Sequence, residues 1–117
     1  MTYRPDFVLP TCTMQGRTVL LEPHGIWTHP IPRRVYLRRQ TFTVHALPPH
    51  IDPAEKQFTD KLRAFRAMYG KDYYVILLVP NQAYERVRRS YPQAYDAIYM
   101  STDIPDLLYQ LKAQSMQ

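Results

Sequence analysis

An unbroken apolar run from Tyr73 to Val79 (YYVILLV) constrains the fold of this chain more than any other stretch. The run ends at Pro80, and both faces of an extended chain with this sequence are apolar. A strand that is apolar on both faces is typical of the middle of a sheet covered by helices on both sides. The sequence therefore predicts a layered α/β protein with this run as a central strand.

A long helix is predicted before this strand. Asp52-Pro53-Ala54-Glu55 is typical of a helix start, with an N-cap, a proline in the first turn and a glutamate three residues after the cap. Gly70 is expected to end the helix, and its outer faces are expected to carry ion pairs such as Lys56–Asp60. The apolar stripe expected to face the core is Phe58, Leu62, Phe65 and Tyr69.

The stretch after the strand predicts a helix, a strand and a helix in turn. A short helix capped by Asn81 should run to about Tyr91 with Arg86 largely outward, and a strand should follow from Tyr95 to Met100. This order predicts parallel strands joined by right-handed crossovers within one domain. Asp103 is expected to cap a last helix, with one face formed by Ile104, Leu107, Leu108 and Leu111.

The N-terminal part predicts a β-hairpin that carries two acidic side chains. Two apolar runs, Phe7 to Leu9 and Thr18 to Leu21, flank the turn-forming stretch Pro10 to Gly16. Asp6 opens the first strand and Glu22 closes the second, so their carboxylates are expected within roughly 5 Å of each other. Neighbouring carboxylates repel unless a cation or a proton lies between them, and Mg²⁺ is the hard cation that suits oxygen ligands.

The motifs Pro5-Asp6 and Glu22-Pro23-His24 resemble those of the PD-(D/E)XK nuclease superfamily, and the most similar branch is the very-short-patch-repair type of endonuclease. The resemblance implies a restriction-endonuclease-like domain over residues 1–117, with a mixed sheet flanked by helices, that hydrolyses DNA with Mg²⁺. Two departures accompany it. His24 stands where the family has lysine, and the acidic helix that precedes the first strand in the family has no counterpart in the five residues before Asp6.

The resemblance also implies roles for individual residues. Asp6, Glu22 and the backbone carbonyl of Pro23 would hold one Mg²⁺ or Mn²⁺. His24 would stand beside the metal in place of the family lysine, and Lys61 on the following helix would supply the positive charge. The alternative is an inactive site on a domain that only binds nucleic acid.

A cluster of arginines between Thr28 and Ile51 predicts contact with a polyanion. The prolines of this stretch exclude a continuous helix, and one or two strands are expected. Arg33-Arg34 and Arg38-Arg39 flank Tyr36, and the chain has a net charge of +5. Arginine suits phosphate oxygens and tyrosine stacks on bases, so these residues and Lys56 are candidate DNA contacts. A solvated edge strand protected by its charges is the alternative.

Other classes of protein fit less well. No apolar run reaches the length of a membrane span, and three glycines cannot form the clustered loop of a nucleotide-binding site. The four histidines and Cys12 do not show zinc-ligand spacing. A single cysteine and an N-terminus without a signal-peptide pattern favour a cytoplasmic location. We therefore expect a Mg²⁺-dependent DNA endonuclease-like domain that forms a homodimer or uses a partner subunit. The alternative is a non-catalytic nucleic-acid-binding or assembly module on the same fold.

Overall fold

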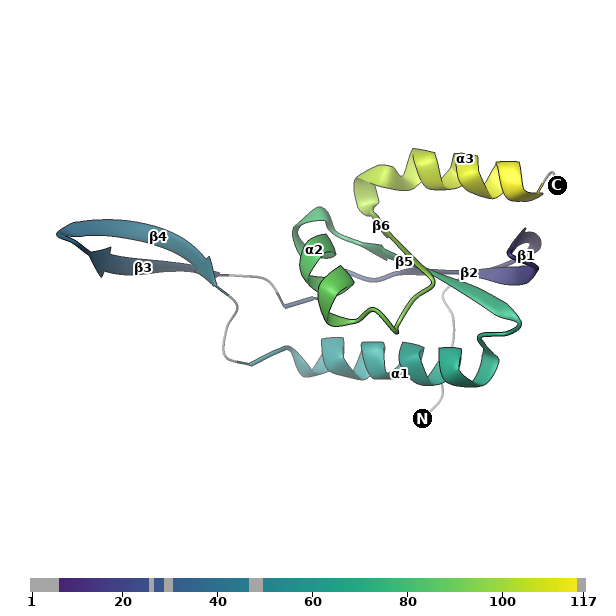
Figure 1. Ribbon diagram of the computed structural model, residues 1–117, viewed down its shortest axis with the longest axis horizontal. Helices are drawn as coiled ribbons and strands as arrows, with labels where there is room; N and C mark the ends of the chain where they lie inside the picture. The colour runs from purple at the N-terminus through teal and green to yellow at the C-terminus, as the bar shows by residue number, and fades with distance from the viewer. Residues whose placement is uncertain (1–6, 26, 29–30, 47–49, 116–117) are drawn as a thin grey trace.

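The computed structural model describes residues 7–25, 27–28, 31–46 and 50–115 of the chain. Within these ranges it contains two β-sheets and three α-helices (Figure 1). The helices lie on both sides of the larger sheet. The predicted α/β fold class is confirmed.

The larger sheet combines antiparallel and parallel pairing, as predicted. Its strands are β1 (Phe7–Met14), β2 (Arg17–Pro23), β5 (Tyr73–Val79) and β6 (Ala97–Met100). They lie in the order β1-β2-β5-β6. The β1–β2 pair is antiparallel, whereas β2–β5 and β5–β6 are parallel. The hairpin therefore leads directly into the parallel half of the sheet.

The helices are α1 (Pro53–Tyr69), α2 (Asn81–Ser90) and α3 (Ile104–Ser115). As predicted, Asp52 caps α1, and its side chain accepts a hydrogen bond from the backbone N–H of Ala54 at 2.8 Å. The predicted cap of α2 is wrong, because Pro80 occupies that position and makes no side-chain cap bond.

Strand β5 is buried on both faces, as its apolar sequence predicts. Its alternate side chains enter two separate cores. The core between the sheet and helices α1 and α2 contains Val75 and Leu62. The core under α3 contains Ile76 and Leu107. Burial on both sides makes β5 the centre of the packed body (Figure 1).

Helix α3 buries a narrower stripe than predicted. Leu107 and Leu111 are buried, but Leu108 is 60% exposed and Ile104 is 40% exposed. A 3₁₀ turn over Ser101–Asp103 leads into the helix, so Asp103 belongs to that turn rather than acting as a simple cap. Two apolar side chains of the predicted stripe therefore remain on the open surface.

The turn of the β1–β2 hairpin is shorter than predicted. The expected loop from Pro10 to Gly16 reduces to Gln15 and Gly16, which have φ angles of 54° and 75°. Two positive φ angles in a two-residue loop are the pattern of a type I′ turn. The pairing register shifts between Leu9 and Thr13, so the extra residues lie inside β1 as an irregularity.

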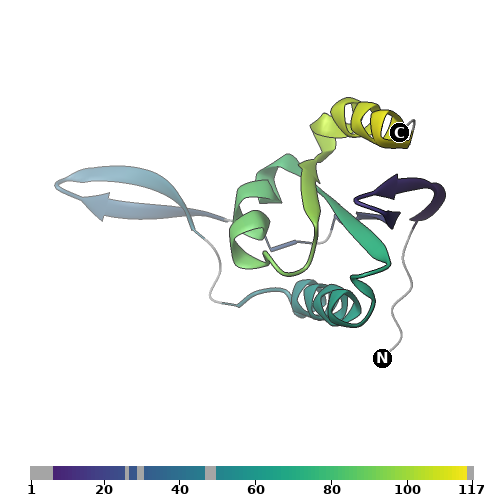
Figure 2. The ribbon, with the colours of Figure 1, turned by 45° about the vertical axis from the view of Figure 1, so that its right-hand side comes forward.

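The smaller sheet is a two-stranded arm that projects from the body (Figures 1 and 2). It consists of β3 (Ile31–Leu37) and β4 (Gln40–Ala46), which pair antiparallel along their whole length. Arg38 and Arg39, which were expected at the edge of a strand, form its two-residue turn. The molecule measures 62 × 33 × 18 Å along its principal axes, and the arm lies along the longest of them.

An ion-pair cluster at the C-terminal end of α1 connects the helix to the larger sheet. Asp96, which precedes β6, accepts hydrogen bonds from Arg66 of α1 at 2.7 Å and from Arg17 of β2 at 3.2 Å. It also accepts the backbone N–H of Val75 in β5 at 2.8 Å. The Arg17 guanidinium lies 4.9 Å from the centre of the Tyr74 ring. One carboxylate thus connects α1 to two neighbouring strands.

Replacement of Asp96 by alanine should lower the free energy of unfolding by about 2 kcal/mol or more, because two guanidinium groups and a buried N–H lose their acceptor. Urea unfolding monitored by circular dichroism measures this loss. The matched control is Asp60→Ala, which removes an exposed carboxylate paired with Arg63 at 3.0 Å and should change stability by less than about 0.5 kcal/mol. Equal losses in the two variants would contradict the role of Asp96.

Candidate nucleic-acid interface

Glu22 lies near the carboxyl end of β2, where the nuclease resemblance implies a metal ligand. Its side chain is only 1% exposed. It shares a face of the strand with Leu20, which packs in the core under α1 and α2. Pro23, whose carbonyl was predicted as a ligand, follows it and is exposed. Asp6 lies outside the described residues. The predicted approach of the Asp6 and Glu22 carboxylates therefore stays a prediction.

His24 is held against helix α1. Its ring stacks on the ring of Phe58, with centroids 3.7 Å apart and planes inclined by 6°. Its backbone N–H donates to the carbonyl of Leu78 at 3.1 Å, and its own carbonyl accepts from Trp27 Nε1 at 2.6 Å. These contacts fix the plane of the imidazole on the α1 side of the sheet, which is also the side of Glu22.

Lys61 follows Phe58 by three residues on α1, so the two occupy neighbouring positions on one side of the helix. Its side chain is half-buried, and no ion pair between described residues involves it. The described ranges contain no group of three histidine, cysteine, aspartate or glutamate side chains that could hold a metal ion. Because Asp6 lies outside them, the Mg²⁺ site stays a prediction.

The two faces of the arm differ in polarity. Directly opposed residues of an antiparallel pair share a face. Arg34 opposes Thr43 and Tyr36 opposes Thr41, and these four form the polar face. The other face, which we call the apolar face of the arm, carries Val35, Leu37, Phe42 and Val44, which are 40%, 58%, 46% and 42% exposed.

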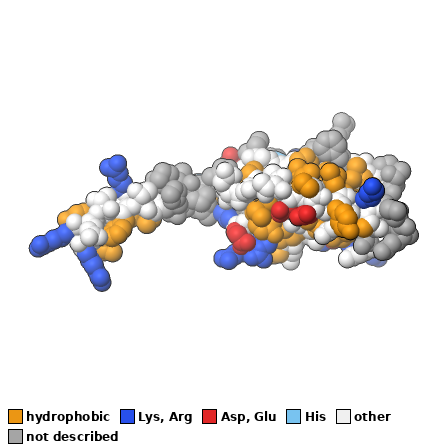
Figure 3. Space-filling view, turned by 90° about the horizontal axis from the view of Figure 1, so that it is seen from above, with side chains coloured by type: hydrophobic (Ala, Val, Ile, Leu, Met, Phe, Trp, Pro, Cys, Tyr) orange, Lys and Arg blue, Asp and Glu red, His pale blue; other side chains and the backbone are white. Residues whose placement is uncertain are grey.

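The formal charge of the arm is entirely positive. Its sequence contains four arginines and no aspartate or glutamate. Arg33, Arg34, Arg38 and Arg39 are all exposed, and Tyr36 is 73% exposed. Figure 3 shows basic side chains that splay from the far end of the arm, with hydrophobic atoms between them. The structure thus brings five of the predicted DNA contacts together on one projecting element.

The turn at the tip has an uncommon backbone conformation. Arg38 and Arg39 have φ angles of 51° and 62°, which lie in the left-handed region. That region costs roughly 1–2 kcal/mol for a residue with a side chain, and two-residue hairpin turns of this type favour Asn-Gly. Two arginines therefore occupy positions that other residues would fit better.

The root of the arm is fixed by a buried carboxylate that the sequence analysis did not identify as a site. Glu55 Oε1 accepts the backbone N–H of Thr28, which leads into the arm, at 2.8 Å. The Thr28 hydroxyl accepts the N–H of Asp52, where the chain returns, at 2.7 Å. Glu55 also accepts bonds from Arg86 of α2 at 2.5 and 3.0 Å and from the hydroxyl of Tyr91. It thereby joins both ends of the arm to α1 and α2.

Glu55 lies in the first turn of α1, as the helix-start motif predicts, and its carboxylate also bonds to Thr28 and to α2. The observed ion pairs correct two predictions. Arg86 was expected to point outward, but its side chain is only 14% exposed because it pairs with Glu55. The expected Lys56–Asp60 ion pair is also wrong for the described side chains, since Asp60 pairs with Arg63 instead.

The electrostatics of the root favour an ionised Glu55. Burial by itself raises the pKa of this carboxyl, but hydrogen bonds from Arg86, Tyr91 and Thr28 outweigh burial and hold the pKa below its ordinary value of 4.5. Burial and the bond to Glu55 raise the pKa of Tyr91. Burial lowers the pKa of Arg86, but the bond to Glu55 leaves that pKa raised overall. A charged pair bonded to a neutral phenol is therefore the stable state at neutral pH.

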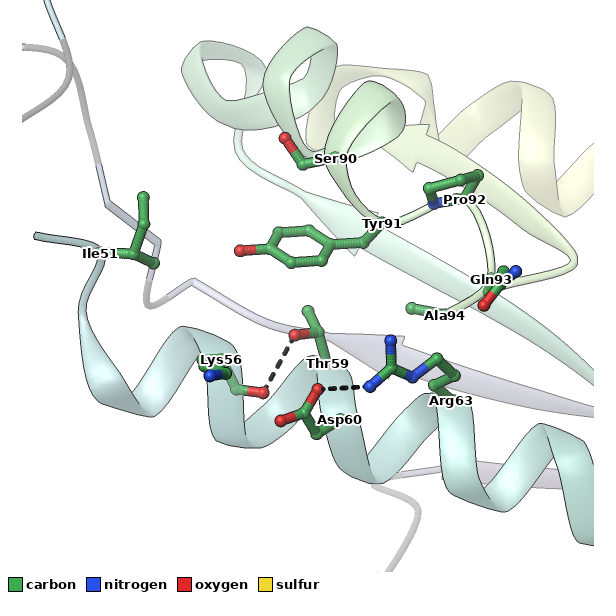
Figure 4. A pocket seen from close by; sticks show the side chains of 10 residues that line it. All are labelled: Ile51, Lys56, Thr59, Asp60, Arg63, Ser90, Tyr91, Pro92, Gln93 and Ala94. Atoms are coloured by element: carbon green, nitrogen blue, oxygen red, sulfur yellow. Dashed lines mark hydrogen bonds and ion pairs between the residues drawn. The ribbon is translucent and has the colours of Figure 1, made fainter.

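A hollow of about 480 Å³ opens between α1 and the loop that follows α2 (Figure 4). The Tyr91 ring lies across it, and Lys56 and Arg63 come from α1. Ile51, where the chain returns from the arm, also lines it. Lys56, the sixth predicted DNA contact, thus lies in a hollow beside the root of the arm.

Comparisons of the chain with protein-family models, with curated proteins and with solved structures give no match. None of the helices in the described ranges has the length and apolar character needed to cross a membrane. The function is therefore inferred from the geometry and charge of the molecule itself.

Glu55→Gln should destabilise the protein at neutral pH by about 3 kcal/mol or more, because Arg86 stays buried without its counter-charge. The folded pKa of Glu55 lies below its unfolded value, so the ionised carboxylate stabilises the fold above the unfolded pKa. This contribution is lost as the pH falls through the folded pKa. Thermal unfolding from about pH 7 to about pH 3 should show the two melting temperatures converging at acidic pH.

The control for this titration is Glu85→Gln on α2. Glu85 is exposed and pairs with Arg88 and Arg89 at the surface, so its loss should leave the melting temperature unchanged across the same range. A constant offset between wild type and Glu55→Gln at every pH would show that the charge of Glu55 does not stabilise the fold.

Proposed function

We propose that this protein binds double-stranded DNA and that the arm is its main contact. The observation that supports this proposal is the arm itself, an exposed ribbon with four arginines and no acidic residue. Guanidinium groups form paired hydrogen bonds with phosphate oxygens, and each neutralised phosphate releases condensed counterions. Two-stranded ribbons are among the elements that enter the grooves of duplex DNA.

The contact extends from the arm onto the body. Lys56 and Arg63 lie on α1 in the hollow beside the root. A duplex that follows the arm toward the body would bring its backbone to these two cations. Tyr36, on the polar face, offers a ring for stacking wherever a base is unpaired.

A second candidate function is metal-dependent hydrolysis of the bound DNA, and the placement of Glu22 favours it. Glu22 lies one residue before the end of β2, the second strand of an antiparallel hairpin, and the chain then passes through the arm and helix α1 to the neighbouring parallel strand β5. This is the arrangement that the resemblance to the PD-(D/E)XK nucleases implies. His24 and Lys61 lie on the same side of the sheet as Glu22, toward α1.

The predicted donor set fits a hard divalent cation. Asp6, Glu22 and the carbonyl of Pro23 are all oxygen donors, which Mg²⁺ and Mn²⁺ prefer. Such an ion lowers the pKa of a bound water and offsets charge on the phosphate. His24, which is fixed by stacking, would orient the attacking water, and Lys61 would neutralise developing negative charge. Without hydrolysis, the same fold would serve as a binding or assembly module.

Loss of the arginines at the tip should reduce both DNA affinity and its dependence on salt. The double variant Arg38→Asn with Arg39→Gly removes two charges and places Asn-Gly, which suits this type of turn, at its two positions. Losing two phosphate contacts should flatten the slope of log Kobs against log salt concentration by about two units. Fluorescence anisotropy with a labelled duplex, repeated over a series of salt concentrations, measures this slope.

The matched control is Arg88→Ala with Arg89→Ala, which removes two adjacent exposed arginines from α2 rather than from the arm. This variant should keep more of the wild-type slope than the tip variant does. If both pairs flatten the slope equally, the net charge of the protein binds DNA and the arm has no special part.

The second candidate predicts cleavage of plasmid or branched DNA with Mg²⁺ or Mn²⁺ and none with EDTA. Glu22→Gln should abolish cleavage and leave the anisotropy titration intact, because it removes a ligand rather than a DNA contact. Lys61→Ala should lose cleavage while still binding, and His24→Lys should keep or raise activity because it restores the family lysine. Absence of metal-dependent cleavage by the wild type would leave DNA binding as the function.

A further inference from the structure

Phosphate binding does not account for the apolar face of the arm. On this face Val35 directly opposes Phe42, and Leu37 lies next to the tip. All three side chains are at least 40% exposed within the described structure. A two-stranded hairpin with an uncovered apolar face is only marginally stable in water. A partner that covers this face would therefore stabilise the arm as well as bind it.

The charge around the apolar face indicates the chemistry of that partner. Arg33, opposite Val44, shares the face at its root end, and Arg38 and Arg39 lie beyond Leu37 at the tip. A second arm laid on this face would bring arginines against arginines, and like charges repel. The minor groove of duplex DNA instead offers two walls of phosphate around a narrow interior of base edges and sugars. Its negative potential attracts arginine side chains.

We propose that the apolar face of the arm enters the minor groove of duplex DNA and that Leu37 acts as a wedge that bends the duplex. This inference rests on the proposed DNA binding and adds the groove and the deformation. Leu37 is the most exposed of the four apolar side chains, and it directly precedes the two arginines of the turn. Leucine inserted between base steps unstacks them and kinks the duplex by about 20–90°. Arg38 and Arg39 would hold the phosphates on either side of the kink.

Hydrogen bonds hold the chain on the body side of the arm, where it leaves and where it returns. Thr28 ties the outgoing chain to the returning chain at Asp52, and Glu55 ties Thr28 to the body. Arg86 and Tyr91 in turn hold Glu55 from the α2 side. The chain is therefore anchored to the body on both sides of the arm that would contact the duplex.

The test measures binding and bending on the same samples of the full chain. A duplex of about 30 base pairs with a donor and an acceptor dye at its ends reports bending by energy transfer, and anisotropy reports binding. Wild type should bind and bring the ends closer. Leu37→Ala should bind within about tenfold of wild type but lose the bend, whereas Leu37→Met should keep it because its side chain still fills the step. A small molecule that fills the minor groove should displace the protein.

The matched control is Leu108→Ala, which removes an equally exposed leucine, 60% against 58%, from α3. It should leave binding and bending unchanged. Binding without a bend, an undiminished bend with Leu37→Ala, or indifference to the minor-groove competitor would each overturn this inference while DNA binding stands. Failure of the wild type to bind any duplex would overturn both proposals. If Leu37→Ala instead converts a dimer to a monomer in sedimentation and leaves DNA bending intact, the apolar face is an interface between copies.

Discussion

The arrangement of arm and body depends on the carboxylate of Glu55. It is completely buried, so its ionisation carries a desolvation cost of several kcal/mol unless donors surround it. The Glu55 carboxylate accepts four hydrogen bonds, one from the Thr28 backbone, two from Arg86 and one from Tyr91. The donors come from two distant parts of the chain, Thr28 before the arm and Arg86 and Tyr91 in α2 and at its C-terminal cap. Satisfying this one charge therefore fixes where the arm leaves the body and how α2 lies against α1.

Helix α1 is held by charge at both ends and by packing between them. Glu55 anchors its first turn to α2, and Arg66 anchors its last turn to Asp96 beside β5. Between these anchors Leu62 is completely buried in the core, and Phe58 stacks on His24 of the segment after β2. The helix therefore connects the chain on either side of the arm to α2 and to the sheet.

Most helices and strands of the body were predicted from the sequence, because the patterns that indicate each one lie within the element or at its ends. The apolar run of β5 is buried on both faces, the Asp52 side chain and Pro53 mark the start of α1, and Gly70 directly follows its last residue. The extra residues inside β1 were not predictable in the same way. Pro10 and the residues after it are typical of a loop, and β1 continues past them because Thr13 and Met14 pair again with β2.

The wrong prediction for Arg86 has a physical cause, which is that its partner is distant in sequence. Arg86 and Glu55 are 31 residues apart, and no sequence pattern within α2 indicates that Arg86 pairs with a buried carboxylate. One weak signal existed, since Arg86 precedes the buried Val87 and so lies at the edge of the inward stripe. On the arm, the arginines that were predicted to contact DNA or to protect an edge strand are all exposed.

The tip of the arm shows a conflict between stability and the residues that occupy it. Arg38 and Arg39 both adopt left-handed backbone conformations, and their adjacent positive charges repel each other. Asn-Gly would relieve both penalties in the same turn. The arm is a two-stranded hairpin whose apolar face is exposed in the described structure, and such a hairpin is only marginally stable. Strained backbone that persists where a better sequence is available is typical of sites where the side chains themselves are required. The strain in the turn therefore supports a role for the arginines outside the fold, in contact with a polyanion that also covers the face behind them.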